Sequence, residues 1–203
     1  MARHPRSFGA GVYHVAAHAS SDQSLFQNDT DRQAFLELLD FTWSKLGLQL
    51  ISYLLMTTHY HALTWIPDKR LSRGLQLLHG RYSLEHNKRH RRSAHLFRAH
   101  CFTRRIRDDY DLLTAERYIA QNPLRAGIVS SPLDWPWSST PTHAGLQPAA
   151  LPLHEELLHG ALGGQASWRK QYTALVQPPQ RERPAEAGLS VAGAGFEPAT
   201  SGL

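Results

Sequence analysis

The spacing of apolar residues over the first 125 positions predicts four strands and three helices. Short, β-prone apolar runs lie at residues 11–17, 48–56, 60–66 and within 95–106. Apolar residues recur at helical spacing in three other segments, at about 30–46, 71–88 and 112–121. We expect Asp29 or Thr30 to cap the first helix, Gly47 to end it, and Asn122-Pro123 to end the third.

This order of elements, β-α-β-β-α-β followed by a helix, predicts an α+β fold. It is the split-βαβ, ferredoxin-like arrangement, an antiparallel sheet with helices, here with one extra C-terminal helix. We expect a main domain over residues 8–140 and a short helical extension over 141–176, where "LHEELLHGALGG" and "SWRKQYTALV" are candidate helices. Residues 177–203 combine Pro, Gly and Ala with few large apolar side chains, so we expect a disordered tail.

The overall charge of the chain indicates what kind of partner it binds. The 203 residues carry 22 Lys and Arg against 17 Asp and Glu, and 13 histidines add positive charge below neutral pH. This balance favours an anionic partner, either nucleic acid or a membrane surface. No apolar run approaches the ~20 residues of a membrane span, and the N-terminus lacks the apolar core of an export signal. We therefore expect a cytoplasmic protein that does not enter a membrane, and its single Cys101 excludes an internal disulfide.

Two histidines one residue apart stand out in "LMTTHYHALTW", residues 55–65. On a strand, His59 and His61 point to the same face, about 6 to 7 Å apart, while Tyr60 points to the other. Two converging neutral imidazoles can bind a metal ion. A chance H-x-H in a chain with 13 histidines is the alternative.

Tyr118 and Asn122, four residues apart at the end of the third predicted helix, share a helix face. An asparagine carbonyl is a hard oxygen ligand that suits Mg²⁺ or Mn²⁺. A tyrosine hydroxyl has an ordinary pKa of about 10. It becomes a nucleophile when a neighbouring group stabilises the negative charge that develops on its oxygen. The alternative is a half-buried helix residue followed by a plain helix cap.

These segments carry a family resemblance. "LMTTHYHALTW", followed by "RYIAQNPLRAGIVSSPLDWPWSS", resembles the single-tyrosine HUH transposases, specifically the REP-associated tyrosine transposases, from about Tyr13 to Ser139. The resemblance implies a ferredoxin-like fold and a divalent metal, Mg²⁺ or Mn²⁺, bound by His59, His61 and Asn122. It also implies that Tyr118 attacks single-stranded, hairpin-containing DNA through a 5′-phosphotyrosine intermediate. No nucleotide cofactor is required, and the protein is expected to be a monomer or a homodimer.

The chain departs from the family pattern at two places. Thr57 and Thr58 stand where the family commonly has proline and asparagine, and Tyr60 replaces a small apolar residue. After "YHV" the chain reads "AAHAS", where the family often has Arg-Gly-Asn. Tyr110 is a competing nucleophile, but Thr114 follows it at the ligand spacing and three aspartates surround it, which favours Tyr118.

A basic block follows the second predicted helix and includes its end. We expect DNA contacts from its arginines and lysine and from one arginine after Asn122: Arg81, Lys88, Arg89, Arg91, Arg92, Arg104, Arg105, Arg107 and Arg125. A solvated surface is the alternative for this block. Trp135 and Trp137 either stack on unpaired bases or pack within the protein.

Two other functions stay open at this point. One is a domesticated relative that binds DNA hairpins without cutting them, and the other is a metal-dependent hydrolase that uses water as the nucleophile. The end of the chain suggests a separate hypothesis, because residues 195–198, Gly-Phe-Glu-Pro, can be encoded by the T-arm sequence of a transfer RNA gene. The reading frame would then overlap such a gene, and an ordinary tail is the alternative.

Overall fold

The computed structural model describes residues 8–20 and 23–178 and contains one four-stranded antiparallel sheet. The strands are β1 (Gly11–His18), β2 (Gln49–Leu55), β3 (His59–Ile66) and β4 (Phe102–Arg105), in the order β2-β3-β1-β4. Both β1 and β2 run antiparallel to β3, and β4 runs antiparallel to β1. The predicted ferredoxin-like α+β fold is confirmed.

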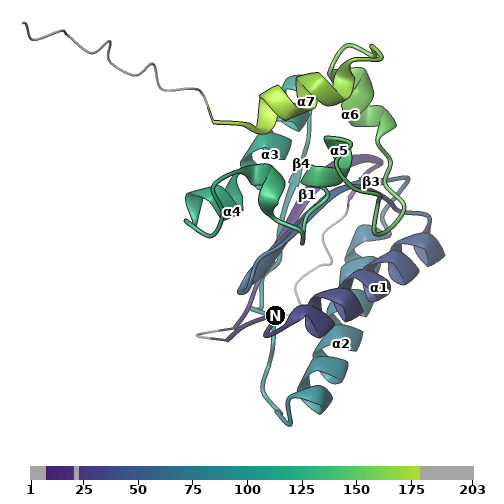
Figure 1. Cartoon of the computed structure of the whole chain (residues 1–203). Coiled ribbons are helices and arrows are strands. Elements are labelled where there is room, and N and C mark those ends of the chain that lie inside the picture. The colour runs from purple at the N-terminus through teal and green to yellow at the C-terminus, as the bar shows by residue number, and fades with distance from the viewer. Residues whose placement is uncertain (1–7, 21–22, 179–203) are drawn as a thin grey trace, which may run out of the picture.

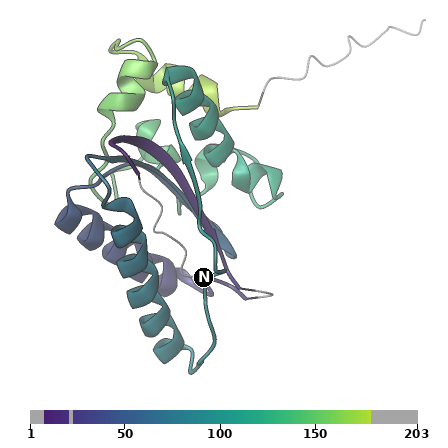
Figure 2. The same ribbon diagram turned by 180° about the vertical axis from the view of Figure 1, so that it is seen from behind.

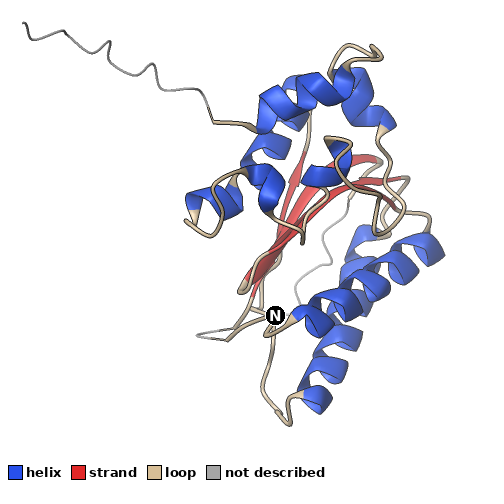
Figure 3. Ribbon diagram, in the orientation of Figure 1, coloured by secondary structure: helices blue, strands red, loops and turns tan. Residues whose placement is uncertain are grey.

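Helices cover both faces of the sheet (Figures 1 and 3). The long helices α1 (Asp29–Leu46) and α2 (Leu71–Arg89) pack on one face, and Figure 2 shows the same layering from behind. The other face carries α3 (Asp109–Ala120), α6 (Glu156–Ala161) and α7 (Trp168–Val176). Shorter elements are α4 (Asn122–Arg125), a 3₁₀ turn (Pro132–Asp134) and α5 (Thr140–His143).

Helix boundaries differ from the predictions where a side chain caps the helix. The first helix is capped by Asn28, not by Asp29 or Thr30, because the Asn28 side chain accepts from the backbone N–H of Asp31 at 3.0 Å. The third helix begins three residues earlier than predicted, because Asp108 accepts from Asp111 N–H at 2.8 Å. Gly47 ends α1 in the left-handed conformation, as predicted.

The fourth strand is much shorter than the predicted apolar run within 95–106. Only Phe102–Arg105 pairs with β1, and Phe97 makes an isolated bridge to Ala19. Residues between α2 and β4 instead cross from the helical layer to the sheet edge, with the backbone N–H of Ser20 donating to Leu96 at 2.8 Å.

The segment after α4 covers the free edge of β2. Leu55 N–H donates to the Trp137 carbonyl at 2.9 Å, and Ser139 N–H donates to Tyr53 at 3.0 Å. The Trp135 indole N–H donates to the Leu55 carbonyl at 3.1 Å, and the Arg32 guanidinium lies over both tryptophan rings. The two tryptophans thus pack against the sheet edge, and the edge is protected from pairing with another chain.

Helices α6 and α7 of the extension over 141–176 pack onto the α3 face. Leu158, Tyr172 and Val176 share one apolar cluster with Ile119, and the Tyr172 hydroxyl donates to Glu116 at 2.6 Å. The region from residue 179 onward, which includes most of the predicted tail and the Gly-Phe-Glu-Pro sequence, lies outside the described residues. Among the described helices, none combines the length and the apolar character that a membrane crossing requires.

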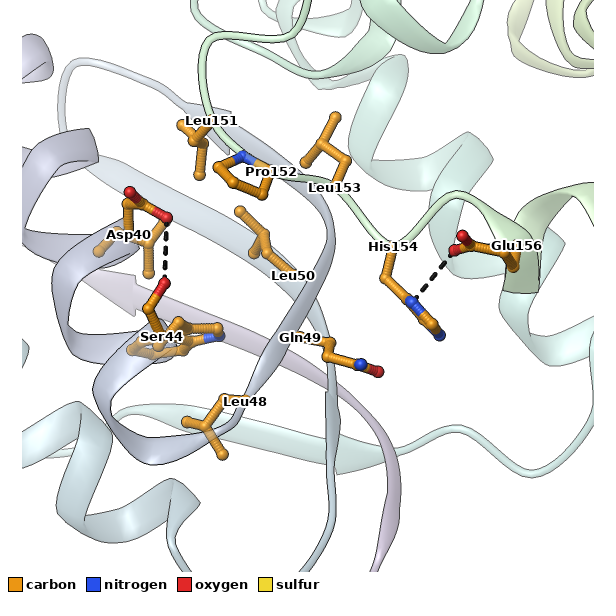
Figure 4. Close-up of a pocket in the computed structure, with 12 residues that line it drawn as sticks. Asp40, Ser44, Leu48, Gln49, Leu50, Leu151, Pro152, Leu153, His154 and Glu156 are labelled. Atoms are coloured by element: carbon orange, nitrogen blue, oxygen red, sulfur yellow. Dashed lines mark hydrogen bonds and ion pairs between the residues drawn. The ribbon is translucent and has the colours of Figure 1, made fainter.

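A cavity of about 210 Å³ lies between the end of α1, β2 and residues 151–154 (Figure 4). Its walls are rich in leucine. Asp40 and Ser44 in its wall hydrogen-bond to each other at 3.4 Å, and His154 pairs with Glu156 at 3.1 Å. These polar groups thus partner one another within the wall of the cavity.

Candidate active site

Four histidines of two central strands lie on the face of the sheet that α3 covers. The pairing of β1 with β3 places His18 opposite His59 and Ala16 opposite His61, and His14 lies two residues further along the same face. The His18 and His59 rings stack at 4.8 Å, and the His59 and His61 centroids are 5.2 Å apart at nearly right angles. The H-x-H motif is therefore half of a four-imidazole cluster.

A hydrogen bond between two imidazoles defines the orientation of His61. His14 Nε2 and His61 Nδ1 are 3.0 Å apart, whereas His61 Nε2 is buried and has no hydrogen-bond partner among the described residues. If His61 donates its Nδ1 proton to a neutral His14, its Nε2 keeps a lone pair available for a metal ion. Metal-binding histidines commonly donate their second ring N–H in this way.

Burial keeps both members of this pair neutral. Burial, followed by the neighbouring imidazoles of His14, His59 and His18, lowers the pKa of His61 to about 2. Burial and the nearby Arg104 lower the pKa of His14 to about 4, against a smaller opposing effect of Asp111. Neutral imidazoles are the form that binds metal ions, so the cluster is ready for a ligand role at neutral pH.

Tyr118 and Asn122 reach this cluster from the junction of α3 and α4. The Tyr118 ring lies 5.7 Å from the His61 ring and 6.3 Å from the His14 ring, and its side chain is 43% exposed. The Asn122 carbonyl oxygen lies 3.4 Å from His59 Nε2. The predicted nucleophile and all three predicted ligands thus lie close together, two on β3 and two at the junction of α3 and α4.

A proline shapes the helix junction that positions these two residues. Helix α3 ends at Ala120, close to the predicted end, and Pro123 lacks the N–H that would continue the ladder. The predicted reason is wrong, however, because Asn122 before the proline stays helical and begins α4. Gln121, between the two helices, keeps a helical conformation with φ −80° and ψ −4°. The near-helical path preserves the four-residue spacing that turns Tyr118 and Asn122 to the same side.

The donor atoms of this cluster fit a divalent metal ion. The unpartnered His61 Nε2 offers a buried lone pair in the tautomer that donates from Nδ1, and the 3.4 Å between His59 Nε2 and the Asn122 oxygen is long for a hydrogen bond. Two imidazoles and a neutral amide oxygen would leave most of the charge of a bound cation uncompensated. Such a cation would attract a phosphate group.

Arg125 is a predicted DNA-binding residue that contacts Tyr118. Its guanidinium carbon lies 5.4 Å from the centre of the Tyr118 ring, and its Nη2 donates to the Gln121 side chain at 3.1 Å. The cation therefore lies over the tyrosine ring and brings positive charge to this side of the site. The arrangement suits a tyrosine that meets an anionic substrate.

The other predicted DNA-binding residues fall into two groups. Arg104, Arg105 and Arg107 lie on or just after β4, where Arg104 donates to both Asp111 oxygens at 2.6 and 2.8 Å and Arg105 donates to the Ala10 carbonyl at 2.9 Å. The second group lies on α2 and the loop after it, in the layer that covers the opposite face of the sheet from Tyr118: Arg81, Lys88, Arg89, Arg91 and Arg92. The basic block of the sequence is thus divided between the edge strand and the α2 layer.

The competing tyrosine is placed differently from Tyr118. Tyr110 lies in the first turn of α3 and is 82% exposed. Its neighbour Asp111 is held by Arg104 and Arg107. The described ring contacts to the histidine cluster from α3 come from Tyr118, not from Tyr110.

Sequence reasoning missed His14 and His18. Both lie on β1, and the spacing of four residues in "HVAAH" places them on one strand face. Their relevance depends on the pairing of β1 with β3, which joins residues about 40 to 50 positions apart in the chain. The sequence therefore shows each pair of histidines on its own strand, but it does not show that the two pairs lie side by side.

Comparisons with known proteins support the fold. No protein-family model and no curated protein sequence matches this chain. Among solved structures, the REP-associated tyrosine transposase bound to a REP hairpin matches with a TM-score of 0.61 and 17% sequence identity. The match covers 73% of this chain and 89% of that chain. At this identity the likeness shows that the chain shares the fold of that transposase.

Proposed function

We propose that this protein is a DNA transposase that cuts single-stranded, hairpin-containing DNA through a covalent bond to Tyr118. The observation that carries the proposal is the position of a partly exposed tyrosine ring 5.7 Å from His61, beside the His59–Asn122 contact. The shared fold with a hairpin-bound tyrosine transposase supports the substrate class. The sequence resemblance over residues 13–139 points the same way.

In this proposal His59, His61 and Asn122 would hold one Mg²⁺ or Mn²⁺, and the bound ion would polarise the target phosphate. The Tyr118 oxygen attacks the phosphorus, forms a Tyr–O–P bond and breaks the bond to the 3′ oxygen. The products are a 5′-phosphotyrosyl enzyme and a free 3′-hydroxyl, which receives the proton that the phenol loses to solvent. Since the covalent bond conserves the energy of the phosphodiester, the reaction is reversible and needs no nucleotide.

Two further side chains support the reaction by position. Arg125, over the Tyr118 ring, stabilises negative charge on the phenolate and on the phosphate that it attacks. His14 holds His61 with its Nε2 free for the metal, and we assign it a positioning role.

DNA binding follows the two basic groups. We propose that Arg125 and the β4 group, Arg104, Arg105 and Arg107, hold the strand that is cut. The group on α2 and its loop provides a second basic surface for the hairpin, through Arg81, Lys88, Arg89, Arg91 and Arg92. Phosphate contacts of this kind lose affinity as the salt concentration rises.

A denaturing-gel assay tests the nucleophile. The full-length protein is incubated with a labelled single-stranded hairpin oligonucleotide and Mg²⁺ or Mn²⁺, and a covalent protein–DNA adduct is expected. Tyr118→Phe should abolish the adduct but retain hairpin binding, because only the hydroxyl is removed. Tyr110→Phe, eight residues earlier on the same helix, is the matched control and should form the adduct normally. An adduct that persists in Tyr118→Phe would refute the assignment.

A hairpin-binding protein that does not cut is the second candidate. It is favoured by the departure "AAHAS" after "YHV", because this segment places a further imidazole, His18, against the ring of the predicted ligand His59. The denaturing gel, run beside a native gel shift that reports non-covalent binding of the same oligonucleotide, decides between the two functions. Hairpin binding without an adduct in either metal, in the unmodified protein, would select this candidate.

A further inference from the structure

A second group of metal-ligand side chains lies in the helical layer on the opposite side of the sheet from Tyr118. Asp31 from the first turn of α1 meets His86 and His90 at the end of α2, with one ligand atom of each within 4.8 Å of the others. His90 Nε2 is 2.9 Å from both carboxylate oxygens of Asp31, and His86 Nε2 is 3.9 Å from Oδ2. None of these residues belongs to the candidate active site.

The fold brings these three residues together by helix geometry. His86 and His90 are four residues apart at the C-terminal end of α2, so they lie on one face, and their ring centroids are 4.4 Å apart. The antiparallel packing of α1 against α2 places Asp31 opposite them. The side chains of Asp31 and His86 are fully buried, and that of His90 is 15% exposed.

The buried position of the His86 ring is not explained by an ion pair with Asp31. Neither of its ring nitrogens has a hydrogen-bond partner among the described residues, although the side chain is fully buried. Its Nε2 faces Asp31 at a distance too long for a hydrogen bond. Native proteins rarely leave a buried ring nitrogen without a partner, so its position points to a missing ligand.

The distances from Asp31 Oδ2 to the two histidine nitrogens are close to those between ligands of a tetrahedral ion. Zinc binds imidazole nitrogen and carboxylate oxygen at about 2.0 to 2.2 Å, which places neighbouring ligand atoms roughly 3.3 Å apart. The observed separations of 2.9 and 3.9 Å lie on either side of that value. Small rotations of the two rings would bring His86 and His90 to an ion at Asp31 Oδ2.

Arg89 is the competitor for the carboxylate. It contacts Asp31 Oδ1, and the backbone N–H of Gln27 donates to Oδ2 at 2.9 Å. The Arg89 side chain is 29% exposed and reaches the carboxylate from the surface. It can remain on Oδ1 while an ion occupies the side of Oδ2 that faces the two histidines.

We propose that Asp31, His86 and His90 form a structural metal site for one divalent transition-metal ion, best matched by zinc. A site of two imidazoles and one carboxylate suits zinc better than magnesium or calcium, which favour oxygen ligands. The ion ties the start of α1 to the end of α2, and its fourth ligand is water. The proposal does not depend on the function proposed for Tyr118.

The test measures zinc and Co²⁺ binding to the full-length, chelator-treated protein. Because the candidate active site also contains imidazoles, His59→Ala/His61→Ala serves as the background in which that site is removed. This background should still bind one ion per chain, give the visible absorption of tetrahedral Co²⁺, and melt at a higher temperature with zinc. Adding His86→Leu should weaken binding by at least about tenfold, as should adding His90→Gln.

His95→Ala is the matched control, because His95 is an exposed histidine of the loop that follows α2. It should leave the affinity for zinc unchanged in the same background. If His86→Leu fails to fold, the partly exposed His90→Gln gives the answer. The proposal is overturned if the background protein binds no zinc at micromolar concentration, or if its affinity survives both His86→Leu and His90→Gln.

Discussion

The two faces of the sheet each gather histidines, but what surrounds the imidazoles differs. On the α3 face, the partners of His14, His18, His59 and His61 are one another and neutral groups, among them the Thr58 hydroxyl, the Asn122 amide and the Tyr118 ring. On the α1–α2 side, His86 and His90 surround the buried carboxylate of Asp31, which Arg89 also contacts. The first cluster contains neutral ligands, and the second contains its own anion.

This difference in charge separates two uses of one residue type. A cation held by neutral ligands retains its full charge and must find an anion outside the protein, for which a DNA phosphate is suited. A cation beside Asp31 would be partly neutralised from within, which suits a structural role. The presence or absence of a carboxylate therefore indicates the role of a histidine cluster better than the number of its histidines does.

The sharpest test of this comparison lies within the triplet His59-Tyr60-His61. His61→Ala removes a proposed metal ligand, so adduct formation should fall by about 10²- to 10³-fold, the usual cost of losing one stabiliser of transition-state charge. Tyr60 points to the other face, where its hydroxyl lies 2.7 Å from His79 Nε2. Tyr60→Phe should keep adduct formation and lower the free energy of unfolding by about 1 kcal/mol.

The measurements are the rate of adduct formation at saturating metal and the free energy of unfolding in urea. Both variants should remain folded, since each keeps most of its packing. Equal losses of cleavage in Tyr60→Phe and His61→Ala would show that the two faces do not act separately.

A smaller effect is expected at His14, which contacts His61 rather than the substrate. His14→Phe removes the acceptor for His61 Nδ1, so the metal concentration for half-maximal cleavage should rise by about 10- to 100-fold. The maximal rate at high metal should recover. His14→Gln provides a carbonyl oxygen as an acceptor and should restore much of the affinity.

The metal titration separates positioning from catalysis. A positioning role moves the half-saturating metal concentration and leaves the maximal rate. If His14→Phe instead lowers the maximal rate at an unchanged half-saturating concentration, the role assigned to His14 is wrong.

Local patterns predicted the elements well. The short apolar runs of β1 and β3 reflect strands buried on both faces, and the spacing in α1 and α2 reflects one buried helix face; both kinds of information lie within a few residues. The errors also have local causes, since Asn28 and Asp108 cap their helices through side-chain hydrogen bonds that compete with other nearby capping residues. Family resemblance, not periodicity, supplied the roles of Tyr118 and Asn122.

What the sequence did not predict depends on contacts between distant segments. The His18–His59 stacking requires the register of β1 on β3, and the Asp31–His90 contact joins residues 59 positions apart. Register is set jointly by both faces of the sheet and by irregularities such as the shift between Leu50 and Ser52. No window of the sequence contains that information, so both histidine clusters emerged only in three dimensions.

The smallest expected effect concerns His79, a histidine of the α1–α2 face that lies outside both clusters. Its ring stacks on Phe97 at 4.1 Å, and burial lowers its pKa to about 4. A pKa lowered by folding means that the unfolded chain takes up the proton first. The stabilising contribution is therefore complete above the ordinary pKa of about 6.5 and is lost as the pH falls from there towards 4.

Between pH 7.5 and 5.5 this loss should amount to about 1 kcal/mol, reduced slightly because the side chain is not fully buried. Urea unfolding at the two pH values, with a chelator present, measures it. His79→Gln keeps an acceptor for the Tyr60 hydroxyl but cannot titrate, so its pH dependence should be smaller by that amount. Identical pH dependence in the two proteins would mean that His79 titrates normally in the folded chain. Burial alone would then be too weak to lower the pKa of a histidine in this protein. The lowered pKa of His61 on the α3 face would have to come from its contacts with His14 and His59.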